Sequence, residues 1–126
     1  MPAGVHYAPG MAFDPTTGSE ISPEVARALI GAGGLLIDVR EDDEWDAGHV
    51  PGALHIPLGQ LVERADELPD DRQLVVICRS GARSARATAF LASSGFEALN
   101  LAGGMHAWAQ AGLRFQATDG APGVVA

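Results

Sequence analysis

The sequence has one cysteine, no lysine and no long apolar run, and each of these absences excludes a class of protein. A single cysteine cannot form an internal disulfide, so nothing in the chain requires an oxidising compartment. No apolar run reaches the roughly 18 residues that a membrane-spanning helix needs. The segment 1–18 has no lysine or arginine and no apolar core of the kind found in secretory signals. We therefore expect a cytoplasmic protein with no membrane partner.

Basic residues are scarce and of one kind, because 8 arginines stand against 16 acidic residues and give a net charge of −8. An acidic chain is poorly suited to nucleic acid, which requires neutralisation of its phosphates, so we expect no nucleic-acid partner. Three of the arginines, Arg79, Arg83 and Arg86, lie within eight residues that begin next to the single cysteine, Cys78. Positive charge concentrated beside one thiol favours the binding of a small anion.

The chain has the length and the apolar content of one domain with its own core, since it contains 126 residues of which 47% are hydrophobic. The two ends are rich in Pro, Gly and Thr and poor in large apolar residues. They predict a flexible N-terminal arm over 1–19 and a loose C-terminal tail over 117–126. The domain itself is then expected at 20–116.

Between the two ends, strand patterns alternate with helix patterns. Short apolar runs predict strands at 35–39, 53–56, 74–77 and 98–101. Helical spacing and capping residues predict helices at 23–31, 41–47, 58–68, 84–93 and 105–111. This alternation predicts an α/β fold with a mostly parallel central sheet and helices on both of its faces.

Cys78 directly follows the clearest predicted strand, a continuous apolar run at 74–77. In parallel sheets ligands bind beyond the carboxyl ends of the strands, and Cys78 is at such an end. The helix predicted from Ser84 brings unpaired N–H groups and a partial positive charge towards the thiol, so we expect the pKa of Cys78 to be low. Gly81 lets the loop bend tightly, so that backbone N–H groups form a nest for an anion or for a sulfur bound to Cys78.

The loop from Cys78 to Ser84 resembles the active-site loop of the rhodanese family, whose pattern is Cys, two residues, Gly, one residue, Arg, and then Ser or Thr. Two further blocks are similar to family motifs and occur in the same order. The first is the segment 38–53, with Asp-Val-Arg at its start and Gly-His-Val-Pro-Gly-Ala at its end. The second is the segment 101–112, with Leu-Ala-Gly-Gly, Trp108 and Gly112. The resemblance covers about residues 20 to 115.

The resemblance implies a sulfurtransferase with Cys78 as the nucleophile. Such an enzyme takes sulfane sulfur from an anionic donor such as thiosulfate, carries it as a persulfide, and passes it to cyanide or a thiol, with ping-pong kinetics. The implied binding residues are those of the loop: Arg79, Ser80, Gly81, Ala82, Arg83 and Ser84. Arg79 is the candidate for the donor's charge, and Arg83 is either an anion contact or a brace of the loop.

Asp38 and Arg40 are interpreted as supporting residues rather than acid–base catalysts. A carboxylate at a strand end accepts N–H groups from the loop that follows, and Arg40 is expected to pair with Glu44. No metal or organic cofactor is expected, because the implied chemistry needs none and the chain has neither a second cysteine nor histidines at metal-ligand spacing.

Three other functions compete with a free enzyme of this kind. A cysteine-dependent phosphatase places arginine six positions after the cysteine, whereas this position is Ser84 and the arginine stands one residue earlier. The shorter loop suits one sulfur better than a phosphoryl group. A non-enzymatic rhodanese-like module for binding or regulation often lacks the cysteine, which is present here. A carrier that passes sulfur to a partner protein uses the same residues as the enzyme and stays open.

Overall fold

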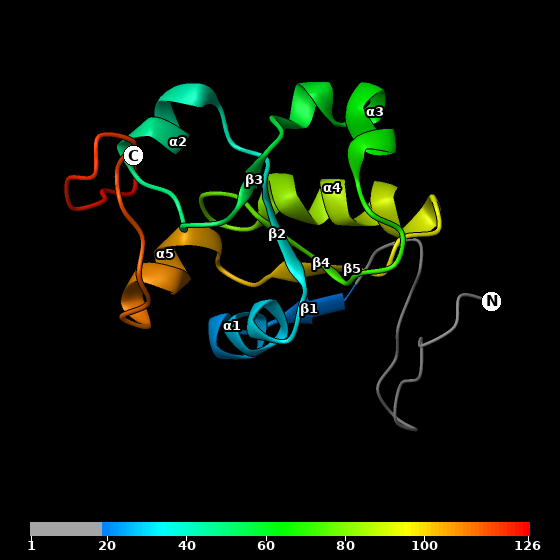
Figure 1. Cartoon of the computed structure of the whole chain (residues 1–126), viewed down its shortest axis with the longest axis horizontal. Helices are drawn as coiled ribbons and strands as arrows, with labels where there is room; N and C mark the ends of the chain where they lie inside the picture. Colours follow the sequence, from blue (N-terminus) through cyan, green and yellow to red (C-terminus); the bar gives the residue numbers. More distant parts are fainter. Residues whose placement is uncertain (1–18) are drawn as a thin grey trace.

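The computed structural model describes residues 19–126, which form a parallel β-sheet flanked by helices (Figure 1). Five strands of this part of the chain make the sheet: β1 (Ser19–Ile21), β2 (Leu35–Asp38), β3 (Leu54–His55), β4 (Leu74–Ile77) and β5 (Ala98–Leu101). They lie in the order β1-β5-β4-β2-β3, and all paired neighbours run parallel. The strand that leads to Cys78, β4, is therefore central.

Helices cover both faces of the sheet, which confirms the predicted fold class. They are α1 (Pro23–Gly31), α2 (Asp42–Ala47), α3 (Leu61–Arg64), α4 (Ala82–Ser93) and α5 (Gly104–Gln110). Figure 1 shows α1 and α5 on one face and α3 and α4 on the other. Ser22 caps α1 by accepting the Val25 N–H, and Pro23 takes the first helical position, in agreement with the helix predicted at 23–31. None of the helices in residues 19–126 is long and apolar enough to cross a bilayer.

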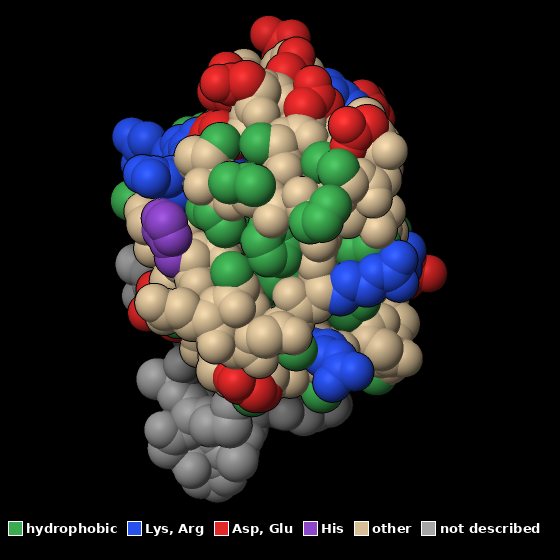
Figure 2. Space-filling view, turned by 90° about the vertical axis from the view of Figure 1, so that its left-hand side faces the viewer, with side chains coloured by type: hydrophobic (Ala, Val, Ile, Leu, Met, Phe, Trp, Pro, Cys, Tyr) green, Lys and Arg blue, Asp and Glu red, His purple; other side chains and the backbone are tan. Residues whose placement is uncertain are grey.

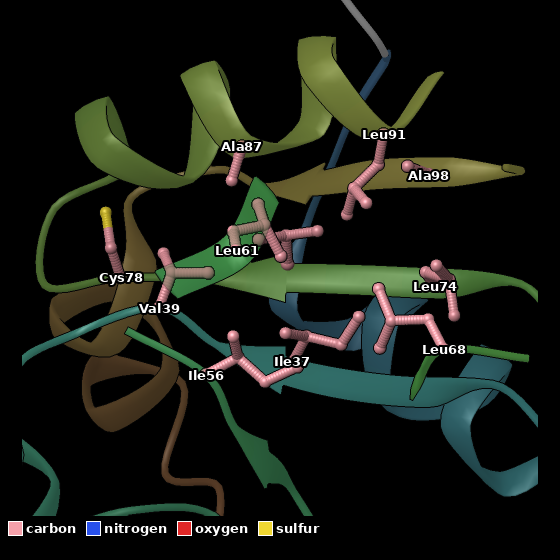
Figure 3. Close-up of a cluster of buried hydrophobic side chains, with 11 residues drawn as sticks. Ile37, Val39, Ile56, Leu61, Leu68, Leu74, Cys78, Ala87, Leu91 and Ala98 are labelled. Carbon is pink, nitrogen blue, oxygen red and sulfur yellow. The ribbon is translucent and has the colours of Figure 1, made fainter. Parts of the chain in front are cut away.

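The central strand β4 is buried on both faces because its side chains alternate between two hydrophobic cores. Leu74 and Val76 lie in the core covered by α3 and α4. Val75 and Ile77 lie in the core covered by α1 and α5. Cys78 continues the alternation and lies at the edge of the first core, on the α4 side (Figure 3). The pattern that makes the strand therefore also sets the face from which the thiol is reached.

The prediction of one continuous helix at 58–68 is wrong. The structure has a 3₁₀ turn at Leu58–Gln60, the single turn α3, and a second 3₁₀ turn at Ala65–Glu67. Gly59 weakens the first turn, and the run of good helix formers that follows is too short to propagate a helix by itself. Leu61 and Leu68 still pack into the first core, so the apolar pattern was interpreted correctly although the backbone was not.

The predicted boundary after residue 19 is wrong by one residue, because Ser19 begins β1. This strand pairs with β5, with Ser19 opposite Leu99 and Ile21 opposite Leu101. Sequence reasoning missed β1 because it is three residues long and has one large apolar side chain. The rest of the predicted arm, residues 1–18, lies outside the described residues. Other ends differ by one or two residues; α4, for example, begins at Ala82 rather than Ser84.

The C-terminal tail is not loose, which corrects the expectation for 117–126. The Thr118 N–H donates to the carbonyl of Asp46 at 3.0 Å, and the Val124 N–H donates to that of Ala47 at 2.9 Å. Val125 packs against the second core. Pro, Gly and Thr signalled turns here rather than looseness. The tail approaches α2 closely at Gly48, where a Cβ atom would lie 2.7 Å from the Val124 carbonyl oxygen.

One face of the molecule carries apolar side chains in its centre, acidic ones at the top and arginines towards the sides (Figure 2). An open pocket of about 210 Å³ lies between α1, α5 and the turn at Pro51, with Arg27 and Arg114 among its lining residues. Its apolar lining, which includes Val50 and Trp108, belongs to the second core. Because Cys78 belongs to the first core, this pocket is separate from the thiol.

Candidate active site

The Cys78 thiol lies at the carboxyl end of β4 and receives hydrogen bonds from the loop that follows it. The backbone N–H of Gly81 donates to Sγ at 3.0 Å, and the hydroxyl of Ser84, in the first turn of α4, donates at 3.2 Å. Gly81 has φ of 112°, a left-handed conformation that favours glycine. The predicted tight bend at Gly81 is therefore present, and it turns N–H groups towards the sulfur.

The pKa of Cys78 is lowered, although the thiol is only 1% exposed. Burial alone acts in the opposite direction and raises the pKa, because it disfavours the charged thiolate. Hydrogen bonds from the Ser84 hydroxyl and from the backbone N–H groups of Ser84, Gly81 and Ser80 outweigh this effect. The loop is thus built to hold negative charge on sulfur, as the sequence predicted.

The first residues of α5 hold the loop through hydrogen bonds to its backbone carbonyls. The N–H of Met105 donates to the Cys78 carbonyl at 2.8 Å, and the N–H of His106 donates to the Arg79 carbonyl at 3.1 Å. Gly104 lies so close that a Cβ atom there would lie 2.7 Å from the backbone carbonyl of Arg79. Sequence reasoning assigned no role to Gly104 or Met105, and the one available signal was the Gly-Gly pair before Trp108.

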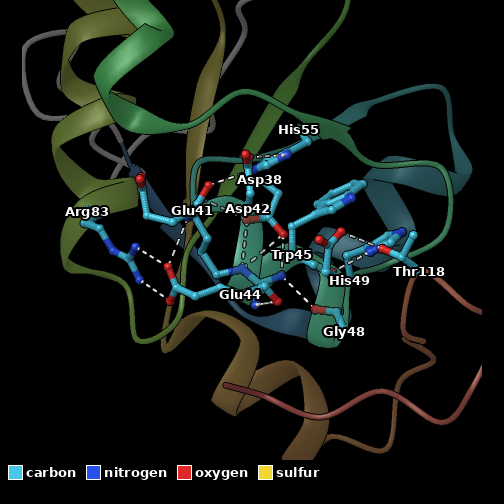
Figure 4. A network of polar contacts seen from close by, with 12 residues as sticks. Asp38, Glu41, Asp42, Glu44, Trp45, Gly48, His49, His55, Arg83 and Thr118 are labelled. Carbon is cyan, nitrogen blue, oxygen red and sulfur yellow. Dashed lines mark hydrogen bonds and ion pairs between the residues drawn. The ribbon is translucent and has the colours of Figure 1, made fainter.

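Arg83 braces the loop against α2 in this structure. Its two terminal nitrogens donate to the two carboxylate oxygens of Glu44 at 2.6 and 2.7 Å, in a bidentate ion pair (Figure 4). The predicted pairing of Glu44 with Arg40 is wrong, because Arg40 reaches the backbone carbonyl of Glu44, at 3.2 Å. The pKa of Arg83 is raised, chiefly by its hydrogen bonds to Glu44 and to a smaller extent by the charge of Cys78.

The Glu44 carboxylate has its pKa lowered from 4.5 to about 2, chiefly by the hydrogen bonds from Arg83. A carboxylate with a lowered folded-state pKa stabilises the fold above its ordinary pKa, and this stabilisation is lost as pH falls towards the folded-state value. We expect Glu44→Gln to destabilise the protein by at most about 3 kcal/mol near pH 7. Glutamine can still cap the Glu41 N–H, so the substitution removes the charge and keeps the cap.

The measurement is urea unfolding of wild type and Glu44→Gln between pH 7 and pH 2.5. The gap between the free energies of unfolding of wild type and Glu44→Gln should be constant above about pH 5 and should close towards pH 2. Glu67→Gln is the matched control, because Glu67 pairs with Arg64 on the surface. A gap as large at pH 2.5 as at pH 7 would show that the ion pair with Arg83 is not its source.

Asp38 and Arg40 form a buried ion pair that ties β2 to α2. Arg40 is 0% exposed, and its Nη2 and Nε donate to the Asp38 carboxylate at 2.6 and 2.9 Å. Nη2 also donates to the carbonyl of Gly48 at 2.8 Å. Asp38 accepts the backbone N–H of Arg40 at 3.1 Å, as expected for a carboxylate at a strand end. The pair therefore fixes the helix that carries Glu44.

His49, in the first motif, and His55, two residues after its end, both stack on Trp45. The ring of Trp45 stacks on His49 at a centroid distance of 3.6 Å and on His55 at 4.7 Å. His55 Nε2 also lies 2.7 Å from the carbonyl oxygen of Arg40. Within residues 19–126, no group of three or more His, Cys, Asp and Glu side chains is arranged to hold a metal ion.

The remaining predicted site residues lie at the rim of the loop. Arg79, Ser80 and Ala82 are exposed, and Arg86 is exposed on α4. The structure thus brings Cys78, Gly81 and Ser84 together, leaves Arg79 accessible to solvent, and engages Arg83 with Glu44. Backbone N–H groups donate to the sulfur, and the exposed guanidinium of Arg79 is available at the rim for an anionic substrate.

Comparison with known proteins agrees with this geometry. The family model for the rhodanese-like domain matches residues 22–111. The chain belongs to the rhodanese-like domain family. A rhodanese-related protein from Thermoplasma volcanium has a crystal structure that superposes with a TM-score of 0.73 at 31% identity, covering 77% of this chain and 96% of that one.

Two relatives of this rhodanese-like chain are named as sulfurtransferases. A sulfurtransferase from Allochromatium vinosum is 45% identical over 87 residues, which are 68% of this chain and 81% of the relative. Thiosulfate sulfurtransferase GlpE from Pseudomonas syringae is 34% identical over 89 residues, which are 70% of this chain and 84% of the relative.

Proposed function

We propose that this chain is a sulfurtransferase that moves sulfane sulfur from an anionic donor such as thiosulfate to cyanide or a thiol, through a persulfide on Cys78. One observation carries the proposal: the Cys78 sulfur accepts hydrogen bonds from the Gly81 N–H and the Ser84 hydroxyl, inside the family's loop. Relatives named sulfurtransferases support the class of reaction. The thiosulfate donor rests on the relative at 34% identity.

The reaction balances without a cofactor or an added oxidant. The Cys78 thiolate attacks the outer sulfur of thiosulfate, the sulfur–sulfur bond of the donor breaks, and sulfite leaves with the bonding electron pair. The outer sulfur of the new persulfide takes a place among the loop N–H groups of residues 79–84. Cyanide then attacks that sulfur, thiocyanate leaves, and the thiolate is regenerated. This sequence is two-step covalent catalysis.

The geometry favours sulfur over a phosphoryl group as the occupant of the loop. Ser84 stands where a cysteine-dependent phosphatase has its arginine, and its hydroxyl lies 3.2 Å from the Cys78 sulfur. The arginine one position earlier, Arg83, is already engaged by both oxygens of Glu44. These contacts leave the loop without a free arginine at the phosphate-gripping position, which supports the sulfurtransferase.

The test is intact mass spectrometry of the full chain after incubation with thiosulfate, before and after cyanide. We expect a gain of one sulfur atom that cyanide removes with formation of thiocyanate. A gain that cyanide cannot remove, but that a protein thiol can, would identify a dedicated sulfur carrier. No gain with thiosulfate or with a low-molecular-weight persulfide would overturn the proposal in favour of a binding module.

Arg79→Ala is expected to raise KM for thiosulfate about fivefold to tenfold and to leave kcat within about twofold. An exposed cation at the rim contacts the bound anion equally before and during reaction, so its loss weakens binding more than chemistry. Steady-state kinetics of thiocyanate formation provide the measurement. Arg86→Ala is the matched control, since Arg86 is also exposed but lies further along α4. Equal effects of the two substitutions would mean that general charge, not a contact of Arg79, attracts the donor.

A further inference from the structure

Asn100 is a buried amide in a strand whose other residues are apolar. It lies in β5 between Leu99 and Leu101 and is 2% exposed. Within residues 19–126, its Oδ1 atom has no hydrogen-bond partner. A buried acceptor without a partner has lost its hydrogen bonds to water and gained none in return, so an apolar side chain would suit this strand better. The amide is therefore present at a cost to stability, which calls for another role.

The other end of the amide is fully engaged, and it contacts the active-site loop. Asn100 Nδ2 donates to the carbonyl of Gly81 at 3.3 Å and to Oε2 of Glu20 at 3.1 Å. Glu20 lies on β1, directly opposite Asn100 in the parallel pairing with β5. Both partners of Nδ2 are acceptors, so a flipped amide would place Oδ1 against a carbonyl and a carboxylate. Glu20 thus holds the amide with its donor towards Gly81.

Gly81 needs such a contact because glycine has no side chain to restrict its backbone. Its N–H is the group that donates to the Cys78 sulfur. Its carbonyl accepts from the Ala85 N–H at 3.0 Å and has the Ser84 hydroxyl within 3.2 Å. Ser84 has a single hydroxyl proton, and when Cys78 is a thiolate this proton is directed to the sulfur. The Gly81 carbonyl then depends on Ala85 and Asn100 alone.

We propose that Asn100 is a positioning residue for sulfur transfer: by holding the Gly81 carbonyl, with Glu20 fixing the amide, it keeps the Gly81 N–H directed at the Cys78 sulfur. The inference deepens the proposed function and, as a statement about transfer, rests on it. Other charged groups also affect the charge on the Cys78 sulfur. Arg83, on α4, interacts with it electrostatically and is paired with Glu44 on α2. Arg79 lies in the loop itself.

The test measures the thiolate directly, as the rate of Cys78 alkylation by iodoacetamide across pH in the full chain. For Asn100→Val we expect the midpoint of the rate–pH curve to move to higher pH. The rate near pH 7 should fall about threefold to tenfold, because a smaller fraction of Cys78 is thiolate. The rate of persulfide formation should fall in parallel. The unfolding midpoint should stay the same or rise, because valine suits a buried strand and leaves no acceptor unpaired. If Asn100→Val does not fold, Asn100→Ala is used in its place.

Leu99→Ala is the matched control on the same strand. Leu99 is buried, so its truncation lowers the unfolding midpoint while Asn100 and its contacts stay in place. Its alkylation midpoint should match that of wild type. The proposal is overturned if a folded Asn100 variant keeps the wild-type midpoint, or if Leu99→Ala moves it equally. Alkylation needs no sulfur donor, so a wild type that never forms a persulfide would overturn the sulfurtransferase and leave this test readable.

Discussion

Cys78→Ser is expected to abolish sulfur transfer, with a loss of turnover of at least about a thousandfold. A serine hydroxyl stays protonated at neutral pH and cannot attack the outer sulfur of thiosulfate, whereas the thiolate is the reactive form of cysteine. The loop that lowers the pKa of Cys78 therefore has no nucleophile to act on. Thiocyanate formation gives the rate, and intact mass after thiosulfate should show no added sulfur.

The same substitution should leave the free energy of unfolding within about 1 kcal/mol of wild type. The serine oxygen can accept hydrogen bonds from the donors that now serve sulfur, the Gly81 N–H and the Ser84 hydroxyl. A large loss of stability together with a loss of activity would make the result uninformative about chemistry, so urea unfolding accompanies the kinetics. We expect activity and stability to separate.

A swapped variant provides the matched control. Cys78→Ser combined with Ser93→Cys has the composition of wild type but moves the thiol to the opposite end of α4, where residue 93 is exposed. A thiol at residue 93 lacks the loop N–H groups and should neither take sulfur from thiosulfate nor produce thiocyanate. Turnover by this variant, or by Cys78→Ser alone, would show that the loop is not the site of transfer.

The centre of the site was predictable because its causes are local in sequence. The run Leu74–Ile77 is apolar without interruption, which predicts a strand buried on both faces, and Cys78 follows it. Gly81 and the helix after it are a few residues away, so the hydrogen bonds to sulfur arise within one short stretch. The lowered pKa of Cys78 follows from that stretch, and so does its place in the fold.

The second layer of the site was not predictable, because it joins residues far apart in the chain. Glu44 and Arg83 are 39 positions apart, and Asn100 lies 80 positions from Glu20. Nothing in the local pattern distinguishes Arg83 from Arg40 as the partner of Glu44. β1 was missed for the same reason, since three residues with one large apolar side chain become a strand only when β5 lies beside them. Strand order and ion-pair partners are properties of the packed sheet.

Arg40→Met is expected to produce the largest loss of stability, about 3–5 kcal/mol. Asp38 and Arg40 are almost completely buried, and removal of the guanidinium leaves the Asp38 carboxylate charged in an apolar setting. The carbonyls of Glu44 and Gly48 lose their donor at the same time. Because a small domain has only about 5–15 kcal/mol in total, a reduced yield of folded protein is part of the expected result. Urea unfolding at pH 7 provides the measurement.

Two further variants separate the charge from the other losses. The double variant Asp38→Leu/Arg40→Met leaves the same carbonyls without a donor but has no buried charge, so it should be more stable than Arg40→Met alone. Arg64→Met, which removes the cation of a surface pair with Glu67, should scarcely move the unfolding midpoint. A double variant no more stable than the single one would mean that the Asp38 charge is not the source of the loss. The role of the buried pair would then lie in the Arg40 guanidinium, whose hydrogen bonds to the carbonyls of Glu44 and Gly48 tie α2 to the sheet.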